Sequence, residues 1–177
     1  MHTLTRKIAV VCATLVATSS AKSGHQYGYL NLYNHCPMAL YIEGYQDKPE
    51  PYMRIELQPL ANFSMPLRET FNGFGNSIKV ATSQGSLDIL QIEYSACFEP
   101  KSTCEPPEQN YYDISKINGD PLLDQGTKIV PSFQVCPKIE CAAGNRHCPN
   151  VYYHPLDNWA VKECDSKSDM DVHFGGL

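Results

Sequence analysis

Apolar and polar residues alternate with a period of two along most of the chain, which is the pattern of half-buried β-strands. In residues 27–33, for example, Tyr29 and Tyr33 fall on one side while Leu30 and Leu32 fall on the other. The other stretches with this pattern are residues 39–45, 53–57, 77–82, 87–94, 111–117, 128–130, 151–153 and 159–163. Proline, glycine and asparagine separate them, and no window has the period of an amphipathic helix. Many short strands joined by turns predict an all-β fold, an antiparallel β-sandwich.

The N-terminal segment has the composition of a secretory signal peptide. Arg6 and Lys7 precede an apolar run of ten residues at positions 8–17, and small residues follow at 19–21. Ten apolar residues are too few to cross a bilayer, which takes about 20, and no later stretch is apolar enough. We therefore expect residues 1–21 to be a signal peptide and the mature protein to be secreted, with no membrane partner.

The charge of the chain excludes another class of partner. The 177 residues include 14 basic and 19 acidic side chains, for a net charge of −5. Residues 1–21 hold two of the basic residues and none of the acidic ones, so the mature net charge is −7. Such a chain, without a basic stripe, is a poor candidate for binding nucleic acid. We expect a monomer in which residues 22–164 form one domain and residues 165–177 form a flexible acidic tail.

Cysteine usage points to disulfides. The chain has eight cysteines, and Cys12 falls in the predicted signal peptide, so an odd number remains and one thiol is left over or pairs between chains. Four lie close together, at positions 136, 141, 148 and 164. The first three, Cys136, Cys141 and Cys148, could be considered as zinc ligands together with His147. The spacing matches no standard zinc module, however, and a secreted protein meets an oxidising environment. We expect disulfides here, and no metal ion or other cofactor.

Two of the predicted strands carry carboxylates on their polar faces. Alternation places Glu93 on one face with Gln91 and Ser95, and it places Asp113 on one face with Tyr111. Carboxylates accept hydrogen bonds from hydroxyl groups, and tyrosine rings pack on the C–H faces of sugars. If these side chains converged on an open groove, they would suit a neutral polysaccharide.

Several segments resemble a known family. The segment CPNVYYHPLDNWAVKEC resembles the C-terminal part of thaumatin-like proteins, and LNLYNHCPMALYIEGY is similar to their first hairpin. DQGTKIVPS and CAAGN resemble a narrower group, the small fungal secreted proteins called yeast-phase-specific or antigenic thaumatin-like proteins. The resemblance implies a thaumatin-like β-sandwich. It also implies that the large cysteine-rich loop domain is lacking, since residues 142–147 stand in its place.

The resemblance also implies how the cysteines pair. It implies the disulfides Cys136–Cys164 and Cys141–Cys148, and Cys97 is then left to pair with neighbouring Cys104. The final cysteine of the family, which pairs with the position of Cys36, is missing here. Cys36 is therefore expected to be the unpaired thiol, buried and inert.

The wider family has an acidic cleft, and this chain keeps part of it. By motif, Glu93, Asp113 and Asp157 match three of its acids, whereas Asn118 stands at the position of another and no arginine is found near 81–82. The resemblance implies a ligand-binding set of Glu93, Asp113, Asp157 and Tyr111, with cell-wall β-glucan or a host glycan as the candidate partner. It also implies a location outside the cell or at the cell wall, and a role as antigen or effector.

Two other functions stay open. The chain could be a weak β-1,3-glucan hydrolase with Glu93, Asp113 and Asp157 as its catalytic residues, although the missing arginine and the substituted aspartate favour a protein without catalysis. It could instead be a protein-binding effector or inhibitor that uses loops such as residues 99–109. Two further expectations concern single residues: Asn62 begins an N-glycosylation sequon with Phe63 and Ser64, and Trp159 is expected in the core.

Overall fold

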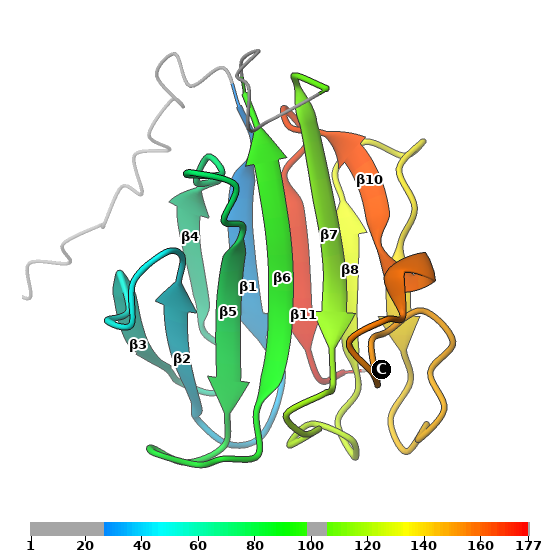
Figure 1. Ribbon diagram of the computed structural model, residues 1–177. Coiled ribbons are helices and arrows are strands. Elements are labelled where there is room, and N and C mark those ends of the chain that lie inside the picture. Colours follow the sequence, from blue (N-terminus) through cyan, green and yellow to red (C-terminus); the bar gives the residue numbers. More distant parts are fainter. Residues whose placement is uncertain (1–26, 99–105, 177) are drawn as a thin grey trace, which may run out of the picture.

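The computed structural model describes residues 27–98 and 106–176, which form two β-sheets packed face to face (Figure 1). The predicted signal peptide, residues 1–21, lies outside the described residues. Sheet A has the order β4-β1-β11-β8-β9, and sheet B has the order β10-β7-β6-β5-β2-β3. In the view of Figure 1, β5, β6 and β7 of sheet B lie in front of β1, β11 and β8 of sheet A.

The strands are short, as the alternation predicts. Those of sheet A are β1 Tyr29–Asn34, β4 Asn62–Pro66, β8 Thr127–Pro131, β9 Ile139–Cys141 and β11 Met170–Phe174. Those of sheet B are β2 Leu40–Tyr45, β3 Met53–Leu57, β5 Asn76–Ala81, β6 Leu90–Cys97, β7 Gln109–Ser115 and β10 Lys162–Asp165. All pairs of neighbouring strands are antiparallel except β1 and β11, which are parallel. The predicted all-β sandwich is confirmed, with this one parallel pair as a departure.

The core lies between the two sheets and follows from the alternation. In β6, Leu90, Ile92 and Tyr94 are buried, whereas Gln91 and Glu93 between them face outward and are half-buried. Each large apolar side chain buried in this way stabilises the fold by about 1.5–3 kcal/mol. The alternation thus commits one face of each sheet to the core and leaves the other to carry polar chemistry.

The prediction of a flexible tail after residue 164 is wrong. Met170, Val172 and Phe174 are buried in β11, and this strand lies in the middle of sheet A between β1 and β8. Their alternation with Asp171 and His173 is a strand pattern, but it is short and sits in an acidic segment. The domain therefore continues past residue 164 through the described residues to 176.

Other strand predictions near the C-terminal end need correction. Residues 151–153 make only a single bridge, between Tyr152 and Ser115, and residues 158–160 form a short 3₁₀ helix, η1 Asn158–Ala160, before β10 begins. The prediction of Trp159 in the core is also wrong, because its side chain is 58% exposed while neighbouring Ala160 is buried. The strands β4 and β9 were not among the predicted strands.

The cysteines in the described residues pair as the resemblance implies. The disulfide Cys136–Cys164 joins the loop before β9 in sheet A to β10 in sheet B, and Cys141–Cys148 closes the short turn after β9. In the loop-entropy view these bonds stabilise the fold by about 3.5 and 2.5 kcal/mol. Cys97 is disulfide-bonded, but its predicted partner Cys104 lies outside the described residues. Cys36 is a buried free thiol whose pKa is raised by that burial, as expected.

Candidate functional site

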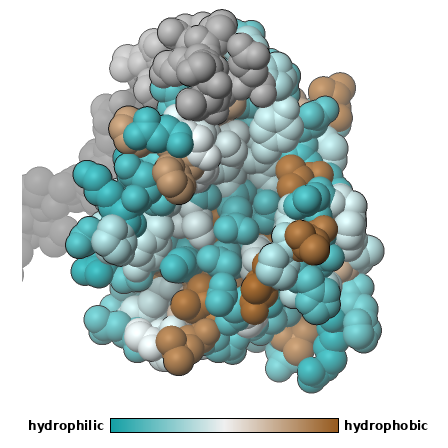
Figure 2. All heavy atoms as spheres, in the orientation of Figure 1, coloured by the Kyte–Doolittle hydropathy of each residue, from teal (hydrophilic) through white to brown (hydrophobic). Residues whose placement is uncertain are grey.

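A groove of about 550 Å³ lies on the outer face of sheet B, over β5, β6 and β7. Figure 2 is drawn from this side and shows hydrophilic residues across the middle of the face, with hydrophobic residues in patches toward its margins. Three of the predicted ligand-binding residues, Glu93, Asp113 and Tyr111, are among those that line the groove. Because β6 and β7 are adjacent strands with the same inward–outward alternation, their polar faces meet in one place.

Glu93 and Asp113 form the centre of this groove. They are direct partners in the register of β6 and β7, and both face outward. Side chains in such a cross-strand pair have Cβ atoms about 4.5–5.5 Å apart. The sheet therefore holds two carboxyl groups side by side. Two such groups repel each other when both are ionised, so the arrangement favours a state in which one of them is protonated.

The electrostatics of the pair follow from burial and from this closeness. Asp113 is only 9% exposed, and its Oδ1 is buried without a hydrogen-bond partner. Burial first, and the charge of Glu93 second, raise the pKa of Asp113 to about 7. Burial also raises the pKa of Glu93, although the nearby Lys79 opposes that shift. Near neutral pH, Asp113 can therefore donate a hydrogen bond while Glu93 accepts one.

Tyr152 stands beside the carboxyl pair and was not among the predicted site residues. Its backbone N–H donates to the carbonyl of Ile114 (2.9 Å) and its carbonyl accepts from the N–H of Lys116 (2.8 Å), so the end of β7 holds it in place. Its pKa is raised by burial and by the negative charges of Asp113, Glu93 and Asp157. The hydroxyl of Tyr152 donates to Oδ1 of Asn158 at 3.1 Å, and both residues line the groove.

Asp157 plays a different part from the other two acids. Its Oδ2 accepts hydrogen bonds from the backbone N–H groups of Tyr153 (3.0 Å) and His154 (2.9 Å). These two bonds lower its pKa and shape the turn that leads into η1. Asp157 is not among the residues that line the groove. The structure thus brings together Glu93, Asp113 and Tyr111, and it leaves Asp157 as a turn-forming residue at the edge of the site.

A neutral network continues the groove at one end. Gln91 Nε2 donates to Oδ1 of Asn118 at 3.1 Å, and Ser77 Oγ donates to Oε1 of Gln91 at 3.2 Å. Asn118, which stands where the wider family has an aspartate, is thus tied to the same face by an amide pair. The site here offers hydrogen-bonding amides in place of a further charge.

Lys79 carries a positive charge on this face, beside the groove. It lies outward on β5, in register with Gln91 and with Glu43, and its Nζ lies 4.4 Å from the centre of the Tyr45 ring. Lys79 also lines a second cavity of about 320 Å³ on the same face, between β5 and the outer strands of sheet B. There Arg54 Nε is paired with Glu43 Oε1 at 2.9 Å. Lys79 was not among the predicted site residues.

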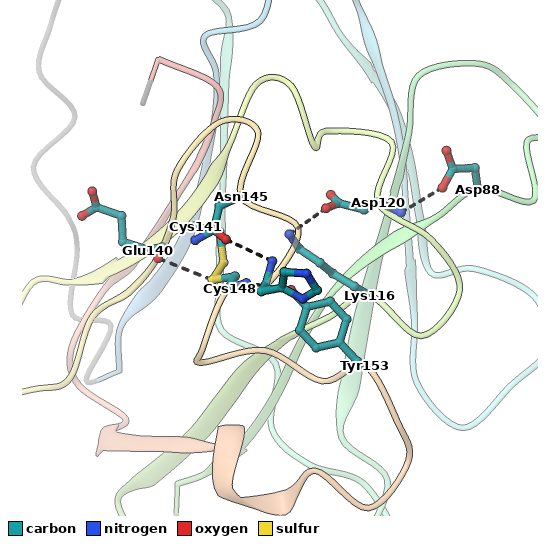
Figure 3. Close-up of polar contacts among 9 residues, drawn as sticks. Asp88, Lys116, Asp120, Glu140, Cys141, Asn145, Cys148 and Tyr153 are labelled. Atoms are coloured by element: carbon teal, nitrogen blue, oxygen red, sulfur yellow. Dashed lines mark hydrogen bonds and ion pairs between the residues drawn. A yellow bond between two sulfur atoms is a disulfide. The ribbon is translucent and has the colours of Figure 1, made fainter.

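Loops at one end of the groove are held by a compact set of contacts (Figure 3). The disulfide Cys141–Cys148 closes the turn after β9, and the N–H of Cys148 donates to the hydroxyl of Tyr153 at 2.9 Å. On the neighbouring loop, the nearly buried Lys116 pairs with Asp120 Oδ2 at 2.7 Å. Asp88 Oδ1 accepts the backbone N–H of Asp120 at 2.9 Å. These contacts hold the loops that carry Tyr152 and Asn118.

Within residues 27–98 and 106–176, no group of three or more histidine, cysteine, aspartate or glutamate side chains is arranged to hold a metal ion. Among those same residues, no helix has the length and apolar character needed to cross a bilayer.

Comparison with known proteins gives matches over most of the chain. Residues 17–175 match the family described as Blastomyces yeast-phase-specific protein. The chain is 33% identical over 172 residues to the antigenic thaumatin-like protein of Arthroderma benhamiae, which covers 97% of this chain and 83% of that relative. It is 24% identical over 179 residues to the secreted thaumatin-like protein calA of Emericella nidulans, which covers 97% of this chain and 98% of that relative.

Solved structures with the same fold are also found. The protein elicitor MoHrip2 of Magnaporthe oryzae superposes with a TM-score of 0.66 at 20% identity, over 84% of this chain and 99% of that protein. The thaumatin-like xylanase inhibitor TLXI superposes with a TM-score of 0.55 at 14% identity, over 82% of this chain and 97% of the inhibitor. At such identities the likeness concerns the fold, and it confirms the predicted thaumatin-like sandwich.

Proposed function

Since this chain belongs to the Blastomyces yeast-phase-specific protein family, we propose that it is an extracellular thaumatin-like protein. In this proposal it binds a neutral glycan in the groove of sheet B and does not cleave it. Its disulfides are typical of proteins outside the cell. The relative from Emericella nidulans is described as secreted, which supports the same location. The candidate ligands are β-glucan of the cell wall and a glycan on a host surface.

The carboxyl pair carries this proposal. Glycan hydroxyl groups both donate and accept hydrogen bonds, so a site that recognises them needs both kinds of partner. Glu93 accepts as a carboxylate, and Asp113, with a pKa of about 7, also donates when protonated. Tyr111 and Tyr152 line the same groove and offer rings on which a sugar can pack. The groove is fixed by its loops, so ligand binding requires little ordering.

The groove suits binding better than hydrolysis because its two carboxyl groups are neighbours on adjacent strands, and Asp157, the third predicted acid, does not line it. Glycoside hydrolysis needs two carboxyl groups that flank the scissile bond. Asp157 is held by the N–H groups of its own turn. Glu93 and Asp113 are instead direct neighbours on adjacent strands, and burial together with the charge of Glu93 raises the pKa of Asp113 to about 7. One observation favours the alternative: a pKa of about 7 is what a general acid requires, so a weak β-1,3-glucan hydrolase is the second candidate.

The likeness to an elicitor and to a xylanase inhibitor supports a third candidate, an effector or inhibitor that binds a protein. Large apolar side chains are exposed beside the groove, on the hairpin that carries Phe71 and Phe74 and on the turn that carries Leu156 and Trp159. Such side chains are common in protein interfaces. Binding of this kind would use the rim and would not depend on the carboxyl pair.

A sedimentation assay with insoluble β-1,3-glucan and with chitin tests the proposal. We expect the mature protein to bind one of them, and Glu93→Gln to weaken binding about tenfold, because a hydrogen bond to a charged group is worth about 1.5–3 kcal/mol. The matched control is Glu140→Gln, which changes an exposed glutamate on sheet A. The proposal fails if neither polysaccharide is bound, or if both variants bind equally well.

An assay of reducing ends on linear β-1,3-glucan separates binding from hydrolysis. We expect no release of reducing ends above the level of the buffer. Turnover that is lost in Asp113→Asn and kept in Glu140→Gln would establish the hydrolase instead.

A further inference from the structure

Strand β4 is an edge strand whose outer face carries a glycosylation sequon. In sheet A it pairs with β1 on one side, and within the described residues no strand pairs with its other side. Asn62, Ser64 and Pro66 are exposed on the outer face, while Phe63 and Met65 pack against the core. Exposed edge strands invite pairing with another chain, and natural proteins protect them. Apart from Pro66 at its end, β4 has neither a charged residue nor a bulge for this purpose.

The register places Asn62 against a tyrosine ring. Asn62 is the direct partner of Tyr33 in β1, and the N–H of Asn34 donates to the carbonyl of Ala61 at 3.0 Å. That bond makes Asn62 and Tyr33 a non-hydrogen-bonded pair, the kind in which facing side chains are closest. The equivalent pair two residues along shows such contact, because Ser64 Oγ donates to Oδ1 of Asn31 at 2.6 Å.

The orientation of the Tyr33 ring follows from its other neighbours. On β11, His173 stacks on Tyr33 with ring centres 4.8 Å apart and planes within 13°. The ring of His35 lies next to that of His173, and its Nε2 is 3.0 Å from Nδ1 of His173. Because β11 and β4 lie on opposite sides of β1, the ring that turns one face to His173 turns the opposite face toward the strand of Asn62.

We propose that Asn62 carries an N-linked glycan whose first N-acetylglucosamine packs on Tyr33 and covers the edge of sheet A. In the attachment step, the Asn62 amide nitrogen bonds to the anomeric carbon of a lipid-pyrophosphate-linked oligosaccharide, the amide loses one proton, and the lipid pyrophosphate leaves. The C–H face of the sugar then lies against the tyrosine ring. The rest of the glycan blocks the open side of β4, which keeps chains from pairing edge to edge.

This site is independent of the groove on sheet B, since the outer faces of the two sheets point in opposite directions (Figure 1). A glycan on β4 therefore leaves the groove accessible. In this proposal the outer face of sheet B binds the ligand, and the glycan on sheet A protects the edge strand β4.

The test uses the full chain secreted from a eukaryotic host. We expect its mass to exceed that of the bare chain by one N-glycan. Treatment with an endoglycosidase that leaves one N-acetylglucosamine on Asn62 should leave the melting temperature of the protein unchanged. Treatment with an amidase that removes all sugar should lower the melting temperature by about 2–4 °C. In Tyr33→Val this difference between the two trimmed forms should vanish. In the matched control Tyr29→Val, on the same face of β1 but opposite Pro66, the difference should remain.

A second variant measures the effect on association. Asn62→Gln lacks the glycan without adding the charge that amidase treatment leaves, and we expect it to form concentration-dependent dimers in size-exclusion chromatography. A secreted wild-type chain with the mass of the bare polypeptide would overturn the proposal. Equal melting temperatures of the one-sugar and sugar-free wild-type forms would overturn the contact with Tyr33.

Discussion

The outer faces of the two sheets hold titrating groups that respond to pH in opposite directions. On sheet B, Asp113 is buried beside Glu93, so its pKa is raised and its neutral form is favoured. On sheet A, burial together with the charges of Lys128 and His35 lowers the pKa of His173, against a small opposite effect of Asp171, so its neutral form is favoured too. Burial disfavours charge in both cases. Because one group is an acid and the other a base, the resulting pH dependences have opposite signs.

The signs follow from proton linkage. An aspartate whose pKa is raised on folding binds more protons in the folded state, so Asp113 stabilises the fold less as pH rises from about 4 to about 7. A histidine whose pKa is lowered on folding binds fewer protons in the folded state. His173 therefore costs stability as pH falls below about 6.5, the ordinary pKa of histidine. Because the Asp113 effect is the larger one, the two groups together make stability fall on balance as pH rises from about 4 to about 7.

The largest expected effect comes from removing the strand that carries His173. Deletion of residues 165–177 should abolish cooperative unfolding, because it removes β11 from the middle of sheet A and leaves β1 and β8 without a partner there. Phe174→Ala, a milder change of a fully buried ring, should cost about 3–5 kcal/mol in urea denaturation. A truncated protein that melts cooperatively at an unchanged temperature would show that sheet A does not depend on β11.

A smaller effect is expected from Asp113→Asn on sheet B. In the wild type, urea denaturation should show stability falling as pH rises through the range 4–7, by up to about 4 kcal/mol. Asp113→Asn removes the titrating group that causes this change. The free energy of unfolding of the variant should therefore depend much less on pH, and at pH 8 the variant should be more stable than the wild type. Exposed Glu140→Gln should keep the wild-type slope. Parallel curves for Asp113→Asn and the wild type would contradict the raised pKa.

The smallest effect is expected from His173→Gln on sheet A. The measurement uses the Asp113→Asn variant, in which the loss of stability with rising pH caused by Asp113 is absent. The stability of this variant should rise between pH 5 and pH 6.5. His173→Gln should flatten this rise, by less than about 1 kcal/mol because the imidazole is partly in solvent. Melting temperatures at pH 5 and pH 7 measure the change, and the exposed His147→Gln serves as the control. A rise that survives in His173→Gln would assign it to another group.

Sequence patterns predict the chemistry of a strand better than that of a loop. In β6 and β7 a strict alternation already put Glu93 and Asp113 on the polar face, and register then made them neighbours. Asp157 and Trp159 lie on an irregular segment, where backbone hydrogen bonds decide what each side chain does. Tyr152 enters the site through a single bridge to β7, a contact between segments far apart in sequence that no local pattern contains. For β11, the acidic composition concealed a period-two pattern of only five residues.

The parallel pairing of β1 with β11 has a consequence for how the molecule is made. Leu30 and Met170 are partners across 140 residues, so the middle of sheet A stays vacant until residue 174 has been synthesised. Until then β1 and β8 present two open edges that face each other across the missing strand. Cys164 precedes β11 and can already be oxidised with Cys136, which would hold the sheets together while the gap is still open. Because β11 follows all the other described strands along the chain, sheet A can close only after every one of them has been synthesised.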